Sequence, residues 1–367
     1  MELNFEAPLN SLSFGNVAIC LLREFYNQKI DVKFFPISNV DVRAYNLDKA
    51  EPDFKAWIEE AINKSVPKYH AQAPSLKLWH LNGSHQRISH KQVLLTFHEL
   101  DTATPAELNI VKNNDKVLFC GTYSKDIFNS FGCDSRAFDL GFDDKSFYPT
   151  KKSYLDDRIT FGLFGKLEPK RKGHKKVIQA WVKRFGKDKK YFLNCALYNH
   201  FLKPEIQEAM LGSFLGGKGF FNVQFLPFME NNSAYNDYLE SNDIAIGMGT
   251  ESWDIPAFTS VAKGKYGIIL NAAGHKDWAN KDNSILINPS GKIPAYDGIF
   301  FHPDQPFNQG QIFDFNEDEF IAGCEEAIKR FENNRVNEDG LKLQQEFTWK
   351  KSVNNILFHL EMLNNEK

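Results

Sequence analysis

Several cationic side chains gather directly behind one apolar segment of the sequence. Residues 159–165 are typical of a buried strand, and the basic loop after them leads to Gly173, where a helical pattern opens. The loop cations are Lys166, Lys170, Arg171 and Lys172. Backbone amides at a helix start, with fixed cations beside them, suit a diphosphate. A solvated basic face accounts for the lysines farther along but explains Lys166 poorly, so we interpret Lys166 and Lys172 as a phosphate site.

A single acid, Glu251, follows a second apolar segment and precedes a helical pattern that ends near Gly264. A carboxylate interacts favourably with the positive end of the helix that follows it. From the residues alone, this interaction is a sufficient explanation of Glu251. The stretch 249–264 therefore assigns no chemistry to the acid by itself.

The elements that must position these groups are short apolar segments that alternate with helical patterns. This alternation predicts an α/β fold with parallel sheets and crossover helices. The segments expected as strands are 3–9, 31–37, 76–83, 92–100, 116–121 and 135–143, then 159–167, 190–197, 241–249 and 266–272. The helical patterns cover 13–29, 53–65, 173–186, 257–264, 316–334 and 348–363. Ligands of such sheets bind beyond the carboxyl ends of the strands, which singles out Gly15, His98, Lys166, Glu251 and Gly274.

The length of 367 residues exceeds one typical core and predicts two domains. A polar, Lys-rich stretch, 143–158, is expected to link them. We therefore expect a first domain over 1–150 and a second over 156–347.

Composition narrows the class of protein. A net charge of −3 gives no overall attraction to nucleic acid or acidic lipid. The five cysteines are scattered without a CxxC pair, which favours reduced thiols in a cytosol over a zinc site. The sequence shows neither a signal-peptide pattern nor a membrane-spanning run, and no Asp-x-Asp follows an expected strand. These features predict a cytoplasmic protein with no required metal and no integral membrane segment; they predict no oligomeric state.

The basic segment FGKLEPKRKGHKKVIQAWVKRF, residues 164–185, resembles the GKWE-x-RKGH variant of the phosphate-binding segment of glycosyltransferase family 4. The resemblance implies the GT-B fold, with two facing Rossmann-like domains and a deep interdomain cleft. By this resemblance, Lys166 and Lys172 bind the diphosphate of a nucleotide sugar, and Arg171 could take the place of Lys172. Gly165 belongs to the same donor-binding loop.

The segment ESWDIPAFTSVAKG, residues 251–264, resembles the family signature that begins E-G-[FW]-[GN]-[LI]-P. It matches at Glu251, Trp253, Ile255, Pro256, Ala262 and Gly264. By this resemblance Glu251 accepts hydrogen bonds from the donor sugar and stabilises positive charge at its anomeric carbon. The donor site would also include Ser252, Trp253, Asp254 and Ile255.

Two residues depart from that signature. Ser252 replaces a glycine, which makes the backbone less permissive. Thr259 replaces the second Glu of the E-x7-E motif, which usually binds the ribose hydroxyls. A threonine cannot act as a charged bidentate acceptor. The choice of nucleotide, UDP or GDP, therefore stays open.

The first half resembles the family more weakly. His98 follows a strand, and the resemblance places it in the cleft against the sugar or the incoming hydroxyl, although a lone His is often structural. Gly15, in the segment 10–18, would let the backbone approach the phosphates. Residues 347–353 resemble the start of the family's C-terminal helix, so we expect helix 348–367 to cross back onto the first domain.

These residues together favour a retaining, metal-independent glycosyltransferase that moves a sugar from a nucleoside diphosphate sugar, with no further cofactor, to a hydroxyl of a saccharide or glycoconjugate. A phage-type enzyme acting on hydroxymethylated DNA bases is one alternative. Acids slightly outnumber bases in residues 1–150, but the basic segment 77–91 keeps DNA open. Its histidines, His80, His85 and His90, are expected in a loop and a helix start. A non-catalytic GT-B protein that binds nucleotide sugars is the other alternative, since Ser252 and Thr259 depart from the signature.

Overall fold

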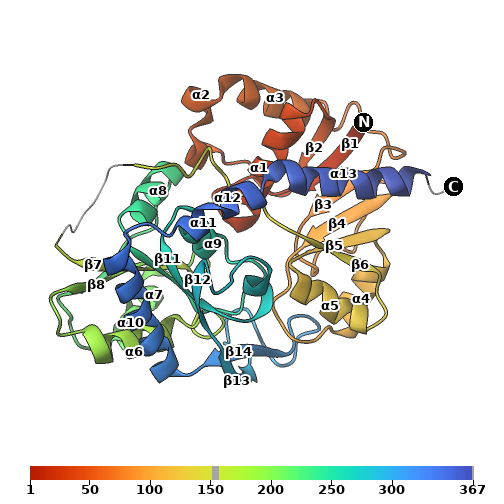
Figure 1. The fold of residues 1–367 in the computed structure, drawn as a ribbon. Helices are drawn as coiled ribbons and strands as arrows, with labels where there is room; N and C mark the ends of the chain where they lie inside the picture. Colours follow the sequence, from red (N-terminus) through yellow and green to blue (C-terminus); the bar gives the residue numbers. More distant parts are fainter. Residues whose placement is uncertain (151–156, 366–367) are drawn as a thin grey trace.

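Two parallel six-stranded sheets, one from each half of the chain, form the framework of the molecule, and one buried hydrophobic cluster contains residues of both halves (Figure 1). The computed structural model describes residues 1–150 and 157–365. The first sheet has the order β2-β1-β3-β4-β5-β6. Its strands are β1 (Glu2–Ala7), β2 (Asp31–Pro36), β3 (Ser75–Leu78), β4 (Gln92–Thr96), β5 (Lys116–Cys120) and β6 (Ser135–Phe138). The second sheet has the order β12-β11-β10-β7-β8-β9. Its strands are β7 (Ile159–Lys166), β8 (Tyr191–Tyr198), β9 (Val223–Phe225), β10 (Ile244–Gly247), β11 (Tyr266–Leu270) and β12 (Ser284–Ile287).

Helices connect the strands and cover the sheets. The first half contains α1 (Ser13–Asn27), α2 (Leu47–Ala50), α3 (Pro52–Asn63), α4 (Pro105–Lys112) and α5 (Thr122–Ser130), with a 3-10 turn η1 (Arg43–Tyr45). The second contains α6 (His174–Phe185), α7 (Pro204–Phe214), α8 (Asn232–Glu240), α9 (Ile255–Ala262), α10 (Glu317–Asn333), α11 (Glu338–Leu341) and α12 (Leu343–Glu346), with η2 (Ala273–Asp277). The predicted α/β class with parallel sheets is confirmed.

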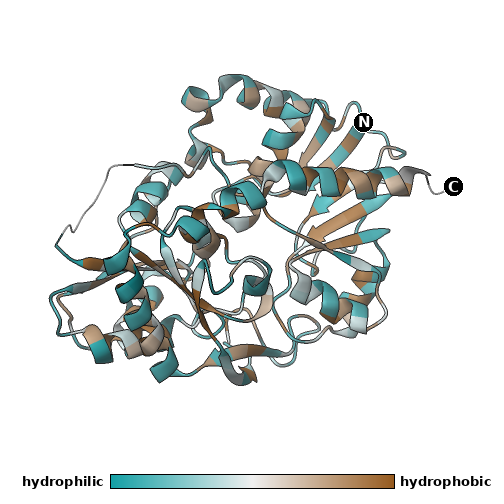
Figure 2. Ribbon diagram, in the orientation of Figure 1, coloured by the Kyte–Doolittle hydropathy of each residue, from teal (hydrophilic) through white to brown (hydrophobic). Residues whose placement is uncertain are grey.

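The strands are apolar because helices cover the sheets and leave central strands little contact with water. Every residue of β4 is buried, and so is every residue of β10 and β11. Figure 2 shows the strands of both sheets mostly brown, whereas the surface helices carry teal along their outer sides. A nearly continuous hydrophobic strand is the pattern expected of a parallel sheet buried on both faces.

The last helix, α13 (Trp349–Asn365), crosses back onto the first sheet, where it packs beside α1 and β4 (Figure 1). Its inward side chains Val353, Ile356 and Leu360 are fully buried. The crossing point depends on Gly141, because a Cβ there would lie 2.2 Å from the amide nitrogen of Trp349. This packing confirms the expected return of the C-terminal helix.

Residues 151–156 of the expected linker 143–158 lie outside the described residues. Residues 366–367 of the expected C-terminal helix also lie outside them. The amide of Tyr148 donates to Oδ1 of Asn236 at 3.3 Å, so the chain before this gap already contacts α8. The domain boundaries 1–150 and 156–347 stay predictions.

A two-stranded antiparallel arm, β13 (Pro289–Pro294) and β14 (Gln311–Phe315), extends from the second sheet toward the first half. Asp101 accepts a hydrogen bond from the amide of Gln311 at 2.7 Å and forms an ion pair with Lys292 at 3.0 Å. Leu100, Ile312, Ala295 and Phe301 make a small buried cluster beneath it. The arm, which the sequence patterns did not predict, therefore adds a further contact between the two halves.

Candidate active site

A cavity of about 440 Å³ lies between the two sheets, at the carboxyl ends of their strands. From the first half it is lined by loops that follow β1, β3, β4 and β6. From the second half it is lined by loops that follow β7, β8, β9 and β10. The loops at this edge of a parallel sheet are where ligands of doubly wound folds bind.

The loop between β7 and α6 brings the expected phosphate-binding cations into the cavity. Lys166, Arg171 and Lys172 all line it, together with Gly165. Gly165 has a φ of +112°, which a side chain would strain, and the Lys172 side chain passes close to the Cα of Gly165. Gly173 adopts a left-handed conformation, φ +66°, as the N-cap of α6. Two glycines thus shape the turn that aims the cations.

A buried carboxylate, Glu168, anchors this cationic loop. Glu168 is 0% exposed and accepts two hydrogen bonds from Arg171, at 2.9 and 3.1 Å. Lys166 approaches the same carboxylate to 2.8 Å. Burial acts to raise the pKa of Glu168, but the charges of Arg171, Lys166 and Lys172 outweigh it and hold that pKa well below its ordinary value. Glu168 is therefore an ionised clamp for two of the three cations.

Glu251 lies against the same cations from the loop after β10. Its carboxylate accepts a hydrogen bond from Nη1 of Arg171 at 2.9 Å and from Nζ of Lys172 at 2.5 Å. Lys166 keeps 37% of its side chain exposed and lies 3.9 Å above the ring centroid of Phe300. The structure thus brings together the three cations and the one carboxylate that the sequence singled out.

Gly274, in the 3-10 turn η2 after β11, holds the backbone of the segment that carries Glu251. The amide of Gly274 donates to the carbonyl oxygen of Glu251 at 2.9 Å. A Cβ at Gly274 would lie 1.8 Å from the carbonyl oxygen of Ser252, closer than any real contact. Only glycine fits there, so Gly274 acts on the site through the backbone.

The expected donor residues after Glu251 have different surroundings. Asp254 has a φ of +61° and caps α9 by accepting from the amide of Ala257 at 3.3 Å. Nε2 of His275 lies 3.1 Å from Asp254 Oδ2; although burial acts to raise the pKa of Asp254, this contact lowers it. Trp253 is 1% exposed and packs in the core, and it borders the cavity together with Ser252 and Asp254. Ile255, Pro256 and Thr259 line the cavity from α9.

His98 does not line the cavity, against the expectation that it contacts sugar. It is 3% exposed, its Nε2 lies 3.0 Å from the carbonyl oxygen of Thr102, and its ring meets the edge of Phe128. The chain beyond β4 remains extended, so Phe97 and Glu99 face the cavity and His98 between them faces away. What His98 offers the site is its backbone carbonyl, which accepts a hydrogen bond from Ser252 Oγ at 3.0 Å.

Gly15 also lies outside the cavity lining. A Cβ at Gly15 would lie 2.0 Å from the carbonyl oxygen of Asn10, so glycine lets the loop before α1 fold tightly onto the first turn of this helix. Asn10 of that loop lines the cavity, together with Ser13 and Phe14 at the start of α1. Gly15 therefore shapes the loop rather than facing a ligand itself.

His80 is one of the cavity residues that the sequence patterns missed. It lies two residues after β3, lines the cavity and lies 4.4 Å from Phe14 between ring centroids. Surrounding protein limits the hydration of the ring and lowers the pKa of His80, a shift that Lys166 and Arg171 reinforce and Glu99 opposes. The rule that singled out residues after strands also applies to His80, but its place in a basic segment hid it.

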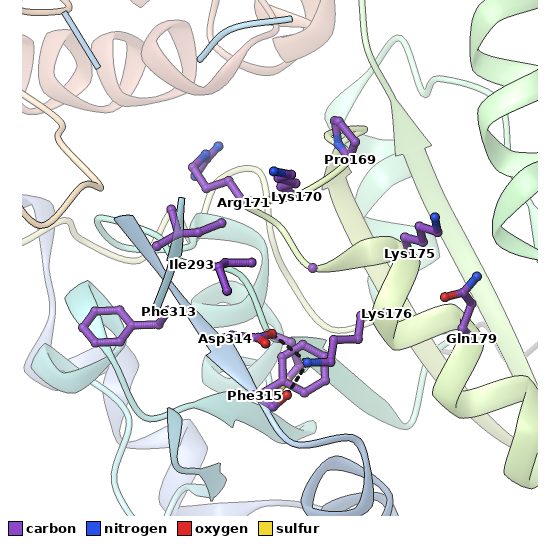
Figure 3. A pocket seen from close by; sticks show the side chains of 13 residues that line it. Pro169, Lys170, Arg171, Lys175, Lys176, Gln179, Ile293, Phe313, Asp314 and Phe315 are labelled. Carbon is purple, nitrogen blue, oxygen red and sulfur yellow. Dashed lines mark hydrogen bonds and ion pairs between the residues drawn. The ribbon is translucent and has the colours of Figure 1, made fainter. Parts of the chain in front are cut away.

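A smaller pocket of about 270 Å³ lies between the start of α6 and the arm (Figure 3). Lys176 crosses it to Oδ1 of Asp314, at 2.7 Å, and to the carbonyl oxygen of Phe315. Of the residues that the structure describes, Arg171 alone lines both this pocket and the cavity between the sheets. The pocket therefore adjoins the cationic loop from its other side.

No protein-family model matches the sequence, and no curated protein sequence matches it. Solved structures resemble it in fold. Sucrose-phosphate synthase from Thermosynechococcus elongatus aligns with a TM-score of 0.64 at 13% identity, over 99% of each chain. An alpha,alpha-trehalose-phosphate synthase (UDP-forming) from Burkholderia vietnamiensis gives 0.65 at 10% identity, over 99% of this chain and 97% of that one. A glycosyltransferase from Rickettsia africae gives 0.66 at 10% identity, over 100% and 99%. At these identities the likeness is one of fold: the chain has the two-domain GT-B fold with Rossmann-like sheets.

Proposed function

We propose that this chain is a retaining glycosyltransferase that moves a sugar from a nucleoside diphosphate sugar to an acceptor hydroxyl of a saccharide or glycoconjugate. The observation that carries the proposal is the convergence of Lys166, Arg171, Lys172 and Glu251 in the cavity between the sheets. Three clustered cations beside a helix start suit a diphosphate, and a carboxylate beside them suits a sugar. The resemblance of two sequence segments to family 4 supports the same roles.

The reaction needs charge neutralisation more than a base. The bond between the anomeric carbon and the phosphate oxygen breaks as the acceptor oxygen bonds to that carbon on the same face. The acceptor proton passes to the departing phosphate oxygen. Lys166, Lys172 and Arg171 stabilise the negative charge on the diphosphate, and Glu251 holds the sugar and stabilises positive charge at its anomeric carbon.

The nucleoside has an aromatic wall available in the second half. Tyr198, His200, Phe201 and Phe228 line the cavity from the loops after β8 and β9. Thr259, which lines the cavity from α9, is the proposed neighbour of the ribose. The structures of similar fold include UDP-forming synthases, which supports UDP as the first nucleotide to test.

Metal independence and a cytoplasmic location are further parts of the proposal. Within residues 1–150 and 157–365, no three or more His, Cys, Asp or Glu side chains are arranged to hold a metal ion. No helix in the same residues has both the length and the apolar character that a membrane span requires.

We rank the DNA-base alternative second, because two of the cations in the segment that kept it open already have acidic partners. In the basic segment 77–91, Lys77 is buried and forms an ion pair with Glu6 at 2.8 Å. Arg87 pairs with Asp115, and His80 faces the cavity. The segment therefore offers DNA little continuous positive surface, and we favour a saccharide acceptor.

The test is nucleotide release from a panel of UDP- and GDP-sugars, followed by mass spectrometry with saccharide acceptors. Lys166→Ala should lower turnover by a factor of roughly a hundred or more while leaving the melting temperature within a few degrees, because Lys166 is partly exposed. Lys170→Ala is the matched control, since Lys170 belongs to the same loop but does not line the cavity. A fully active Lys166→Ala protein overturns the assignment; binding without turnover across the panel favours the non-catalytic alternative.

A further inference from the structure

The two walls of the cavity between the sheets differ sharply in charge. Lys166, Arg171 and Lys172 all come from the second half. Among the described residues that line the cavity from the first half, there is no Lys or Arg. The acidic side chains on that wall are Glu99 and Asp143.

The nearest cations of the first half do not change this balance. Arg23 does not line the cavity and forms ion pairs with Glu51 at 2.8 Å and with Asp143 at 3.2 Å. Lys77 also lies outside the lining and pairs with Glu6. The wall of the first half therefore has no cation to offer a negatively charged ligand.

Aromatic rings dominate this wall. Phe14 lies at its centre, with ring centroids 5.8 Å from Trp79 and 5.0 Å from Phe97. All three side chains are partly exposed and line the cavity. We call these three residues the aromatic platform. Partly exposed rings grouped in a cavity provide apolar faces on which the C–H face of a sugar ring can stack.

The backbone holds the platform in place. Gly83 lies under the indole of Trp79, where a Cβ would come within 2.7 Å of its Nε1. Gly15 follows Phe14 in the first turn of α1, where a Cβ would come within 2.0 Å of the carbonyl oxygen of Asn10. Close backbone packing at two glycines therefore helps to position both rings.

Polar groups stand where the platform meets the cationic wall. Glu99 lies 3.9 Å from Nη1 of Arg171, and His80 packs against Phe14 at 4.4 Å. A ring stacked on Phe14 would thus present its hydroxyls to Glu99 and His80. These residues lie beside the cations assigned to the donor diphosphate, which is where an accepting hydroxyl must be.

We propose, on the basis of the glycosyl transfer argued above, that the acceptor is an uncharged saccharide stacked on the aromatic platform, and that acceptors with a phosphate near the reacting ring are rejected. A phosphate on this wall would face the carboxylate of Glu99 with no unpaired cation of the described first half beside it, since Arg23 already pairs with Glu51 and Asp143. Like charges brought together cost several kcal/mol. The cations across the cavity cannot compensate, because the donor diphosphate occupies them during transfer. This chemistry differs from that of the sugar-phosphate synthases of the same fold.

Saturation-transfer NMR on the whole protein, with unlabelled UDP present, tests the proposal. The probes are glucose, galactose, mannose and N-acetylglucosamine, each beside its 6-phosphate, with maltose and cellobiose. At least one uncharged sugar should receive saturation at its ring protons, roughly tenfold more than its phosphate. Trp79→Phe should weaken the signal and Trp79→Ala should abolish it. Trp57→Phe is the control, because Trp57 packs on Tyr26 and Phe54, outside the cavity.

Glu99→Gln adds a readout of charge. It should raise the signal of the 6-phosphates relative to the free sugars, since the acid on this wall that has no cationic partner from the first half is removed. Preference of the wild-type protein for a sugar phosphate, or no binding of any uncharged sugar in the panel, overturns the proposal. Nucleotide release measured in parallel separates the two claims. Turnover with a sugar phosphate as acceptor supports glycosyl transfer but overturns the proposed uncharged acceptor. Binding of an uncharged sugar without donor turnover supports the sugar site but overturns glycosyl transfer.

Discussion

Replacing Glu168 with Gln should destabilise the second half, and it should also release Lys166 and Arg171 of the cationic loop from their shared carboxylate. The amide has nearly the same shape as the carboxylate, so the change removes charge and little volume. Arg171 and Lys166 each lose a partner, and Arg171 is itself buried. Removing one member of a buried ion pair costs about 3–5 kcal/mol, because the remaining charge is left uncompensated. For a cooperative unit of the size of the second half, each kcal/mol lowers the melting temperature by about 2–4 °C, so the expected loss is about 6–20 °C.

The pH dependence of this loss follows from the low pKa of Glu168. In the unfolded chain a Glu titrates near 4.3, whereas in the folded protein its pKa is held well below that value. The stabilisation is therefore complete above about pH 4.3 and is lost as the pH falls from there toward the folded pKa. The gap in melting temperature between wild type and Glu168→Gln should be constant from pH 6 to 8 and should narrow below about pH 4.3.

Thermal unfolding followed by circular dichroism, repeated across this pH range, measures both effects. Glu325→Gln is the matched control, since it removes an acid from an exposed pair with Arg184 in the same half, and such pairs contribute little. Nucleotide release by Glu168→Gln should fall as well, because Arg171 and Lys166 lose their anchor. Equal melting temperatures for the two variants, or a gap that does not narrow in acid, would refute the view of Glu168 as an ionised clamp.

Three further outcomes test separate parts of the site. Thr259→Glu should change the affinity for the nucleotide or the preference between UDP and GDP, measured by titration calorimetry; a mere loss of stability with unchanged binding would show that Thr259 is not beside the ribose. Gly274→Ala should cost about 1–3 kcal/mol or more and lower turnover, because its Cβ would lie 1.8 Å from the carbonyl oxygen of Ser252; an unchanged melting curve contradicts that packing. His174 has a pKa lowered to about 3 by burial and by Lys172, so its ring should stay neutral from pH 5 to 8 in NMR titrations; protonation within that range contradicts its burial beside the cation.

The sequence predicted most of the sheets because their strands are buried on both faces and carry continuous apolar runs. β7, β10 and β11 are examples, and each was expected from such a run. The arm of β13 and β14 was not expected, because its β13 residues Pro289, Gly291 and Lys292 lack any such run. Its strands pair with each other, and its contacts to Asp101 join residues about 200 positions apart. No local pattern reports such a contact.

The sequence singled out residues that line the cavity where residue type and position coincide, as at Lys166 and Glu251, whose roles stay predictions. It was less reliable where the direction of a side chain decides. His98 and Glu99 are successive residues, and only the Glu99 side chain faces the cavity. Successive side chains of an extended chain point to opposite sides, so an error of one residue in the expected register selects the wrong side chain. Glu168 had no assignment, because one acid in a basic stretch looks like a solvated surface residue. Its role follows from burial beneath Arg171, which only the folded chain reveals.

The hydrogen-bond partner of Ser252 changes the interpretation of this departure from the family signature. In place of the usual glycine, Ser252 looked like a sign of lost catalysis. Its hydroxyl instead donates to the backbone carbonyl of His98, across the two halves of the molecule. Ser252 is the residue after Glu251, and His98 is the residue before Glu99. This one hydrogen bond therefore ties the carboxylate proposed to hold the donor sugar to the carboxylate proposed to meet the acceptor, and such a bond between buried groups contributes about 1 kcal/mol. A glycine cannot make this tie, so the substitution is consistent with a catalytic cleft whose two walls are held in register.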